Sequence, residues 1–212
     1  MDRNVASLRK EYAGATLLRE NVHPDPVEQF GSWFSQCREA RLPEPNAMTL
    51  SCVGADSRPS SRMVLLKGID EGGFTFFTNF ESRKARELAL NPFASLVFWW
   101  QGLERQVRIE GVVERIDDET AAQYFDSRPR TSQLGAWASP QSRTVESRRE
   151  LEDRFESFAA QFPDRVPKPE HWGGFCLRPD RMEFWQGRQG RLHDRISYTL
   201  TGTTWAIERL AP

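Results

Sequence analysis

The sequence is poor in the residues that build metal sites and disulfide frameworks. Only 3 cysteines and 3 histidines occur among 212 residues, and none of them stands in a CxxC pair or in a metal-binding spacing. Cys37, Cys52 and Cys176 form an odd, scattered set, which is typical of reduced thiols in the cytosol. We therefore expect no metal site and a cytoplasmic protein.

Long hydrophobic runs and an excess of charge of one sign are missing as well. No segment is apolar over the length that crosses a bilayer, and the N-terminus lacks the apolar stretch of a signal peptide. With 29 basic and 30 acidic side chains, the formal net charge is -1, whereas a nucleic-acid backbone requires a basic surface. We expect neither a membrane nor a nucleic acid as partner, and a small anion held by a local basic cluster stays open.

The chain also has no glycine-rich dinucleotide loop, no P-loop and no GxSxG nucleophile motif. An enzyme without its own nucleophile or acid–base constellation commonly leaves the chemistry to a cofactor and supplies binding and orientation. The chain is rich instead in aromatic residues, with 14 Phe and 7 Trp. Such residues suit a β-rich core and the wall of a pocket for a flat ligand.

Short strand-like runs separated by turn residues dominate the pattern and predict a mainly β protein with peripheral helices, of the α+β class. The expected helices cover 27–40, 82–90, 118–127 and 145–162. We interpret residues 1–26 as an N-terminal arm or lid outside the core and 27–212 as a single antiparallel barrel domain. The expected strands are 47–53, 60–67, 74–78, 94–100, 106–116, 174–177, 181–186, 191–200 and 204–209.

Two cations, Arg83 and Lys84, follow Ser82 in the first turn of an expected helix. The helix dipole already presents positive charge there, so the arrangement is mildly destabilising by itself. It makes sense if a phosphate docks there, because free backbone N–H groups and the two side chains would converge on it. Two solvated side chains that point away would explain the pattern equally well.

Arg191, His193 and Arg195 alternate along an expected strand and would therefore share one of its faces. A row of charges cannot face an apolar core, so it faces either solvent or a ligand. The preceding strand carries Trp185, and a cationic row beside an indole suits a planar anion.

A third group combines Tyr124, Arg128 and Ser132. The first two are four residues apart on an expected helix, and Pro129 is able to start a new turn that carries Ser132 to the same side. A phenol, a guanidinium and a hydroxyl together can bind a phosphate through hydrogen bonds. From the residues alone, an ordinary amphipathic helix end is the preferred interpretation.

Arg62 and Lys67 flank an apolar run, and strict alternation places them on opposite faces of the expected strand. If both contact one ligand, the strand must bulge or Lys67 must lie beyond its end.

Together these segments resemble the pyridoxamine/pyridoxine 5′-phosphate oxidase family, from about Leu8 to Pro212. Each segment is short, but their order and spacing make the resemblance specific. The segments are 62–67 (RMVLLK), 77–84 (FTNFESRK), 105–107 (RQV), 124–137 (YFDSRPRTSQLGAW), 141–142 (QS), 172–175 (WGGF), 183–187 (EFWQG), 191–195 (RLHDR) and 208–212 (ERLAP).

The resemblance implies an FMN-binding split β-barrel that forms a homodimer, with FMN at the subunit interface. It implies oxidation of pyridoxine or pyridoxamine 5′-phosphate to pyridoxal 5′-phosphate in vitamin B6 salvage. Dioxygen would be reduced to hydrogen peroxide, and ammonia would leave from the amine.

The resemblance also implies roles for individual residues. Arg191 and His193 would be catalytic and lie over the pyridine ring. Phe77 stands where some relatives carry Tyr, so a contact made by its backbone would survive and one made by a hydroxyl would not. The implied FMN ligands are Arg62, Met63, Val64, Leu65, Leu66, Lys67, Phe77, Thr78, Arg83, Lys84, Gln106, Gln141, Ser142, Trp185 and Arg195. The implied substrate contacts are Arg9, Lys10, Glu11, Tyr12, Lys67, Tyr124, Arg128, Ser132, Arg191 and His193.

Two alternatives remain at this stage. A related flavin oxidase of a phenazine-type precursor would share the FMN half of the site but need not keep a grip on a substrate phosphate. A flavin-binding protein without turnover would bind FMN and form no peroxide. The complete set Lys67, Tyr124, Arg128 and Ser132 favours the vitamin substrate.

Overall fold

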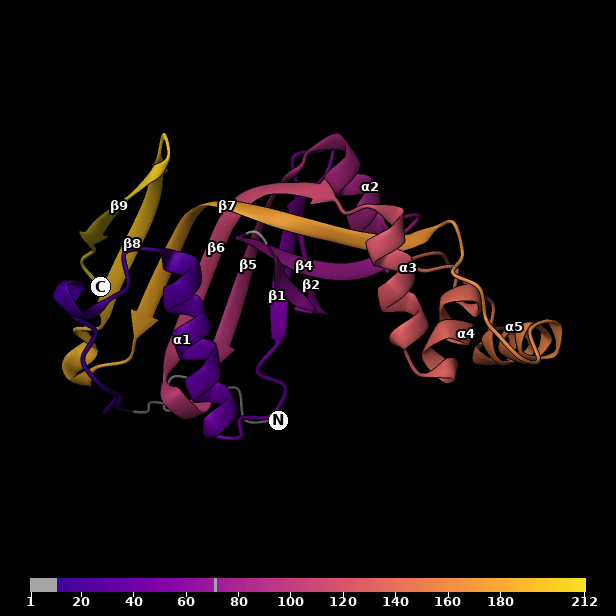
Figure 1. Ribbon diagram of the computed structural model, residues 1–212, viewed down its shortest axis with the longest axis horizontal. Coiled ribbons are helices and arrows are strands. Elements are labelled where there is room, and N and C mark those ends of the chain that lie inside the picture. Colours follow the sequence, from indigo (N-terminus) through magenta and orange to yellow (C-terminus); the bar gives the residue numbers. More distant parts are fainter. Residues whose placement is uncertain (1–10, 71) are drawn as a thin grey trace, which may run out of the picture. The chain divides into compact units, whose positions relative to one another are not determined.

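The structure, a computed structural model, describes residues 11–70 and 72–212 and is mainly β with helices at its periphery (Figure 1). The predicted class is therefore confirmed. The strands are β1 (Ala47–Val53), β2 (Pro59–Leu65), β3 (Gly68–Asp70), β4 (Gly73–Asn79), β5 (Phe93–Trp100), β6 (Arg105–Arg115), β7 (Trp172–Gln186), β8 (Asp194–Thr201) and β9 (Thr204–Arg209). The helices are α1 (Pro26–Glu39), α2 (Arg83–Leu90), α3 (Asp118–Ser127), α4 (Arg130–Ala138) and α5 (Arg148–Gln161), with 3₁₀ turns η2 (Arg19–Asn21), η3 (Gln101–Leu103) and η4 (Gln189–Arg191).

Capping side chains fix where the helices begin. Asp25 accepts a hydrogen bond from the Val27 N–H before α1, and Asp117 accepts one from the Thr120 N–H before α3. Ser82 plays the same part for α2. Such caps satisfy N–H groups that have no partner inside a helix. All four expected helices are confirmed, whereas α4, which follows Pro129, was foreseen only as a turn.

The strands form a nine-stranded sheet in the order β2-β1-β5-β6-β7-β4-β3, with β8 paired to β7 and β9 to β8. Strand β7 is continuous, so the prediction of two separate strands at 174–177 and 181–186 was wrong. Its first half pairs antiparallel with β4, and its second half pairs antiparallel with β8. Pro179, which has no N–H to donate, lies between the two registers and costs neither ladder a hydrogen bond.

The expected strand 191–200 begins later than predicted. Arg191 lies in the turn η4 with φ 61°, beside Gly190 with φ 65°, and β8 starts only at Asp194. Positive φ values leave the β region, so alternation does not apply to Arg191 and His193. The prediction that these two residues share a strand face with Arg195 was therefore wrong. A hairpin turn at Thr201-Gly202 joins β8 to β9, since Thr201 pairs with Thr204.

The chain divides into two compact units, and strands β1, β5, β6 and β7 run through both of them. The first unit combines the chain up to Thr49 with Ser95–Glu110 and Pro179–Pro212. Its core is aromatic: the ring of Phe30 lies 4.9 Å from that of Phe98, and the ring of Trp33 lies 5.2 Å from that of Phe184. The single domain expected for 27–212 stays a prediction.

The second unit combines Leu50–Ala94 with Gly111–Arg178. Helices α3, α4 and α5 gather in one group there (Figure 1), around a buried cluster that includes Phe125, Leu134 and Trp172. This cluster also takes in the partly buried Phe77 of β4. The helices are thereby held against the sheet, next to the cavity that is the candidate site.

Cys37, Cys52 and Cys176 are free and buried. No helix in the described part of the chain is both long and apolar enough to cross a membrane.

Candidate functional site

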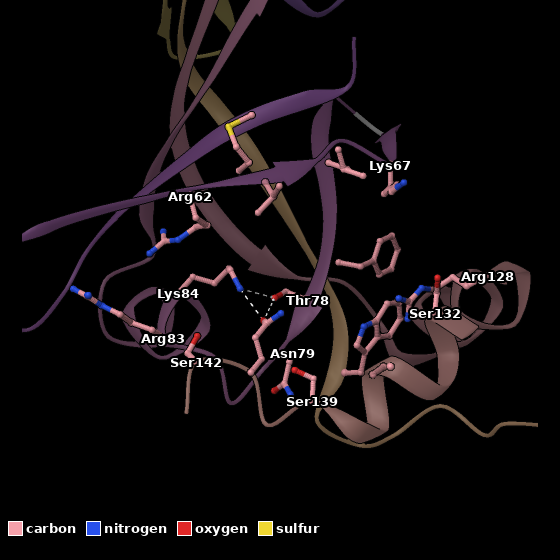
Figure 2. A pocket seen from close by; sticks show the side chains of 18 of the residues that line it. Arg62, Lys67, Thr78, Asn79, Arg83, Lys84, Arg128, Ser132, Ser139 and Ser142 are labelled. Atoms are coloured by element: carbon pink, nitrogen blue, oxygen red, sulfur yellow. Dashed lines mark hydrogen bonds between the residues drawn. The ribbon is translucent and has the colours of Figure 1, made fainter. Parts of the chain in front are cut away.

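A cavity of about 960 Å³ lies in the second unit (Figure 2). That is the size at which protein pockets enclose small organic ligands and cofactors. Its walls come from β2 and the loop after it, β4, the start of α2, helices α3 and α4, the loop after α4, and Trp172 at the start of β7. Among the described residues that line it are five cations and no carboxylate: Arg62, Lys67, Arg83, Lys84 and Arg128. The cavity is therefore built for anionic groups.

Lys84 lies at one end of this cavity, in the first turn of α2, and only 8% of its surface is exposed. Its Nζ donates to Thr78 Oγ1 at 3.0 Å (Figure 2) and to Gln141 Oε1 at 2.8 Å. It also donates to Ser82 Oγ at 3.2 Å, and all three partners are neutral. Burial, helped by the nearby Arg62 charge, lowers the pKa of Lys84 to about 8. A buried ammonium without a carboxylate in contact is the environment that a bound anion would stabilise.

Arg62 and Arg83 line the same end and share one carboxylate, that of Glu87 on α2. With Lys84, three cations therefore face a single anion. The excess positive charge stands where the N-terminus of α2 adds its own partial positive charge and free N–H groups. The anion site predicted from Ser82-Arg83-Lys84 is thus matched by the geometry, although its ligand stays a prediction.

Arg128 lies at the other end, between α3 and α4. Its guanidinium carbon is 4.8 Å from the centre of the Trp172 ring and 5.5 Å from that of Phe125. Its Nη1 is buried and has no hydrogen-bond partner among the described residues. Burial lowers the pKa of Arg128. A buried N–H donor without an acceptor is costly, and a phosphate oxygen would satisfy it.

Tyr124 and Ser132 line the cavity together with Arg128, as the helical spacing and the turn after Pro129 predicted. The Ser132 N–H donates to the Pro129 carbonyl at 2.8 Å, which places Ser132 in the first turn of α4. Lys67 reaches this end because β2 stops at Leu65, so it lies beyond the strand, as one of the two predicted solutions required. Its own N–H is held by the Thr75 carbonyl at 2.8 Å.

Flat aromatic rings and apolar side chains join the two ends. The Phe77 ring stacks on Tyr124 at 4.0 Å between centres and on Trp172 at 5.3 Å. Met63 and Leu65 of β2 line the opposite wall and are 62% and 37% exposed. A cavity with apolar walls and cationic ends suits an elongated, flat molecule with a charged group.

Eleven of the residues predicted to hold FMN line this cavity: Arg62, Met63, Val64, Leu65, Lys67, Phe77, Thr78, Arg83, Lys84, Gln141 and Ser142. Leu66 does not line it: this residue follows the end of β2, and its side chain is buried with 6% of its surface exposed. Gln106, Trp185, Arg191, His193 and Arg195 belong to the first unit and are not among the lining residues. Arg9 and Lys10 lie outside the described residues.

Sequence reasoning missed several lining residues, among them Ser60, Asn79, Ser139 and Trp172. A signal existed for Asn79 and Trp172, which belong to the FTNFESRK and WGGF segments that carry the resemblance. Ser60 lies in an expected strand and Ser139 after an expected turn, but neither is singled out by its residue type, so only the folded chain brings them to the cavity.

A second group of predicted residues meets in the first unit. The rings of Trp185 and His193 lie 4.6 Å apart, and the ring of Tyr12 lies 5.7 Å from each of them. The Arg188 N–H donates to His193 Nδ1 at 3.0 Å, so a neutral His193 carries its proton on Nε2. Arg195 makes a bidentate pair with Glu183, at 2.8 and 3.0 Å. Glu11, the neighbour of Tyr12, is exposed.

Comparison with known proteins identifies relatives over the whole chain. Residues 35–162 match the family model described as pyridoxamine 5′-phosphate oxidase, and residues 172–212 match the pyridoxine 5′-phosphate oxidase C-terminal dimerisation region. Pyridoxine/pyridoxamine 5′-phosphate oxidase of Salinibacter ruber is 54% identical and covers 98% of this chain and 99% of its own. The enzyme of the same name from Verminephrobacter eiseniae is 52% identical over 100% of both chains.

Solved structures give the same picture of the fold. PhzG from Burkholderia lata, in complex with tetrahydrophenazine-1-carboxylic acid, has 28% identity and a TM-score of 0.89, covering 94% of this chain and 100% of its own. A pyridoxamine 5′-phosphate oxidase-related, FMN-binding protein from Nostoc punctiforme has 17% identity and a TM-score of 0.72, covering 93% of this chain and 100% of its own.

Proposed function

Because this chain belongs to the pyridoxamine 5′-phosphate oxidase family, we propose that it oxidises pyridoxine 5′-phosphate or pyridoxamine 5′-phosphate to pyridoxal 5′-phosphate. Dioxygen is reduced to hydrogen peroxide, and the amine substrate releases ammonia. The protein is an oxidoreductase with FMN as cofactor, and its fold is the FMN-binding split β-barrel. The single observation in the structure that supports this function best is the cavity with cations at both ends and no carboxylate among its described lining residues.

The cofactor phosphate belongs, in this proposal, at the end formed by Arg62, Arg83 and Lys84. The residues fit the group: a helix N-terminus, a buried ammonium with only neutral partners, and an excess of positive charge. FMN supplies two-electron redox chemistry, taking electrons from the substrate carbon and passing them to dioxygen. Thr78 and Gln141, which both contact Lys84, keep its Nζ on the cavity side of α2.

The substrate phosphate belongs at the other end, where Lys67, Tyr124, Arg128 and Ser132 converge. The unpartnered Nη1 of Arg128 supports this placement, because a phosphate oxygen would accept the hydrogen bond for which the described residues offer no acceptor. Trp172 and Phe125 flank the guanidinium and hold it by cation–π contact. The substrate would thus be anchored by its phosphate while its ring lies along the apolar wall.

Arg191 and His193 orient the pyridine ring in this proposal. The arginine guanidinium is a cation that donates hydrogen bonds and accepts none, so the part of Arg191 is orientation and electrostatic stabilisation. His193 has its Nδ1 held by the Arg188 N–H, which leaves Nε2 as the nitrogen that faces a ligand. Tyr12, whose ring meets Trp185 and His193, belongs to the arm that closes over the substrate in this proposal.

The C-terminal dimerisation region at 172–212 supports a homodimer. We place FMN at the subunit interface, where Gln106, Trp185 and Arg195 complete its site, some of them from the partner subunit. Support comes from Met63, which lines the cavity with 62% of its surface exposed. An apolar side chain in that position gains from being covered by a partner or a flavin ring. Cytoplasmic residence stays a prediction that rests on the free, buried cysteines.

A direct test measures aldehyde and peroxide when the FMN-loaded protein meets pyridoxine 5′-phosphate in air. Equal yields of the two products are expected, because each turnover makes one of each. Bound FMN without product from this substrate or from pyridoxamine 5′-phosphate would contradict the proposed function.

Oxidation of a phenazine precursor is the second candidate, favoured by the likeness to PhzG. That protein was solved with a carboxylic acid that carries no phosphate, and its identity of 28% is well below the 54% of the curated relative. The unpartnered Arg128 Nη1 and the neighbouring Lys67 favour a phosphorylated substrate instead.

The pKa of Lys84 predicts how FMN affinity depends on pH. The group has a pKa of about 8 in the protein without ligand, and a phosphate beside it would raise that value. Below pH 8 Lys84 is protonated before and after binding, so the affinity does not change. Above pH 8 binding must take up a proton, and the dissociation constant rises by up to about tenfold per pH unit.

Titrations of FMN into the flavin-free protein between pH 7 and pH 9 check this prediction. Lys84→Arg is the matched variant, because arginine keeps its charge throughout that range and should abolish the dependence. A dissociation constant that stays flat above pH 8 in the unaltered protein would contradict it.

A further inference from the structure

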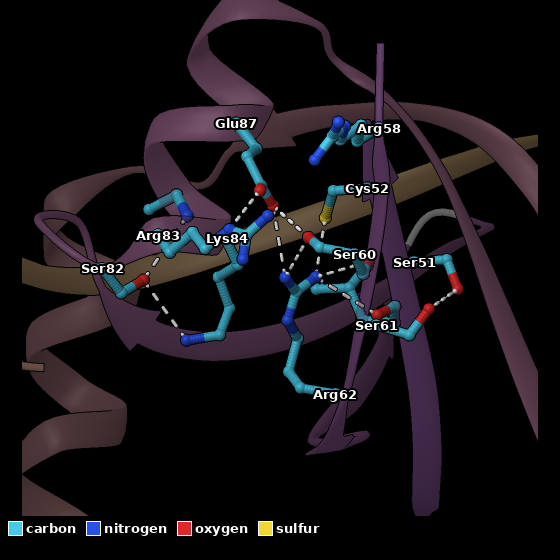
Figure 3. Close-up of polar contacts among 12 residues, drawn as sticks. Ser51, Cys52, Arg58, Ser60, Ser61, Arg62, Ser82, Arg83, Lys84 and Glu87 are labelled. Atoms are coloured by element: carbon cyan, nitrogen blue, oxygen red, sulfur yellow. Dashed lines mark hydrogen bonds and ion pairs between the residues drawn. The ribbon is translucent and has the colours of Figure 1, made fainter. Parts of the chain in front are cut away.

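Glu87 is a buried carboxylate that joins helix α2 to strand β2 (Figure 3). Its Oε2 accepts hydrogen bonds from Ser60 Oγ at 2.5 Å and from Arg62 Nη2 at 3.2 Å, and its Oε1 accepts one from Arg83 Nε at 2.7 Å. Burial by itself raises the pKa of Glu87, but the hydrogen bonds from Ser60 and Arg83 and the two arginine charges outweigh it and lower the pKa. The carboxylate is therefore ionised, and both arginines are held by the same charge.

Arg83 is presented to the cavity by this contact. Its side chain is 60% exposed, and Glu87, one helical turn further along α2, binds it through Nε alone. Among the described residues, no hydrogen bond is made by its two terminal nitrogens. Those two nitrogens form the pair that grips phosphate oxygens in a bidentate manner. Holding the guanidinium by Nε therefore fixes its direction and leaves this pair available.

Arg62 is fixed by a denser set of contacts. Its Nη1 donates to the Leu50 carbonyl at 3.3 Å, to Cys52 Sγ at 3.2 Å and to the Ser60 carbonyl at 3.2 Å. Its Nη2 donates to Ser60 Oγ at 2.5 Å as well as to Glu87. The side chain is 21% exposed, so most of its motion is already lost before any ligand arrives. Glu87 completes this network from the side of α2.

We propose that Glu87 is a positioning residue for the flavin phosphate: it holds Arg62 and Arg83 in their binding geometry before FMN arrives. This inference rests on the proposed placement of the FMN phosphate at this end of the cavity. Glu87 is not itself among the residues that line the cavity, so it acts through the two arginines. Preorganised donors bind more tightly because less conformational freedom is lost on binding.

Electrostatic repulsion alone predicts the opposite change in FMN affinity. A carboxylate near a phosphate repels it, so removing the charge of Glu87 would tighten FMN binding if positioning played no part. Glutamine keeps the shape and one acceptor oxygen, but its N–H₂ group must face either Arg62 or Arg83, and two donors cannot pair. Glu87→Gln therefore separates the two effects by the direction of the change.

The test compares the dissociation constants of FMN and of riboflavin, which lacks the phosphate, by flavin fluorescence with the flavin-free, full-length protein. The ratio of the riboflavin dissociation constant to the FMN dissociation constant isolates the contribution of the phosphate. In Glu87→Gln the ratio is expected to fall by about tenfold, while the dissociation constant of riboflavin stays unchanged. A merely structural role would weaken the binding of FMN and of riboflavin equally and leave the ratio unchanged. An unchanged or increased ratio would therefore overturn the inference.

Glu81→Gln is the matched control, since it removes the same charge from the segment before α2. The Glu81 carboxylate is 53% exposed and pairs with Arg143, and it contacts neither Arg62 nor Arg83. Its ratio should stay within about twofold of the unaltered protein. Coupling is a second readout: in an Arg83→Ala background, Glu87→Gln should lose much of its effect, because one of the two groups it positions is gone.

Two further outcomes are decided by the same measurements. If Glu87→Gln does not fold, Glu87→Asp keeps the charge but is one methylene too short to reach both arginines, and its ratio should fall; an unchanged ratio would overturn the inference. If the unaltered protein itself binds FMN no better than riboflavin, the proposed phosphate placement fails. If the ratio is large in the unaltered protein and stays large in Glu87→Gln, the positioning role of Glu87 is overturned, whereas the proposed phosphate placement stands.

Discussion

Replacing Arg128 with alanine is expected to lower kcat/KM for pyridoxine 5′-phosphate by about 100-fold or more. The guanidinium would make charge-assisted hydrogen bonds to the substrate phosphate, each contributing about 1.5–3 kcal/mol. Its Nη1 is buried without a partner among the described residues, so the free protein already carries the cost of presenting it. Steady-state kinetics at a fixed, saturating FMN concentration would measure the effect.

Two comparisons make the Arg128 prediction specific. Arg128→Lys keeps the charge but loses the planar fork and the stacking on Trp172, and it should recover only part of the activity. Unphosphorylated pyridoxine should be oxidised equally slowly by the unaltered protein and by Arg128→Ala, because it offers nothing for the guanidinium to bind. A similar loss with pyridoxine would show that Arg128 supports the fold of the site instead.

Replacing Arg191 with alanine is expected to lower kcat by about 100-fold or more while FMN stays bound. Removing one preorganised group that stabilises charge at a reacting centre commonly has an effect of that size. Arg191 adopts φ 61°, a backbone conformation that costs a non-glycine residue roughly 1–2 kcal/mol. Such strain is typical of functional positions, because the surrounding structure must hold the residue there.

Arg191→Gly separates the side chain from the backbone. Glycine adopts positive φ without cost, so this variant should be as stable as the unaltered protein and as inactive as Arg191→Ala. Arg181→Ala, which removes an exposed arginine from β7, is the control and should be fully active. Near-normal turnover in Arg191→Ala would remove the residue from the catalytic assignment.

The sequence predicted the local elements well where short-range chemistry decides them. Ser82, Asp117 and Asp25 mark the beginnings of three helices because each side chain caps the N–H groups next to it. Gly202 marks the last hairpin because its φ of 62° suits glycine best. For Lys67 alternation left two solutions open, a bulge or a position beyond the strand end, and the structure decides for the second, because β2 ends at Leu65.

The sequence patterns gave wrong strand limits where the strand's pairing partner lies far along the chain. The pattern predicted two strands, 174–177 and 181–186, yet β7 continues through Pro179 because its partner changes from β4 to β8 at that point. Arg191 and His193 alternate as a strand would, yet Gly190 and Arg191 form a turn with positive φ. The change of partner leaves no short-range signal, so only the assembled sheet reveals it. The turn had a local signal in Gly190, with φ 65°, but the alternation of Arg191 and His193 obscured it.

Near-neighbour spacing in the sequence determined the mainly β class, and the resemblance of its segments to a known family implied the cofactor and most residues of the cavity. The tertiary structure alone decided which charges meet. It joined Glu87 to Arg62 and Arg83, left Arg128 Nη1 without a partner among the described residues, and buried Lys84 among neutral groups. Burial and pairing set the energy of a charge, and both depend on segments that are distant in the chain.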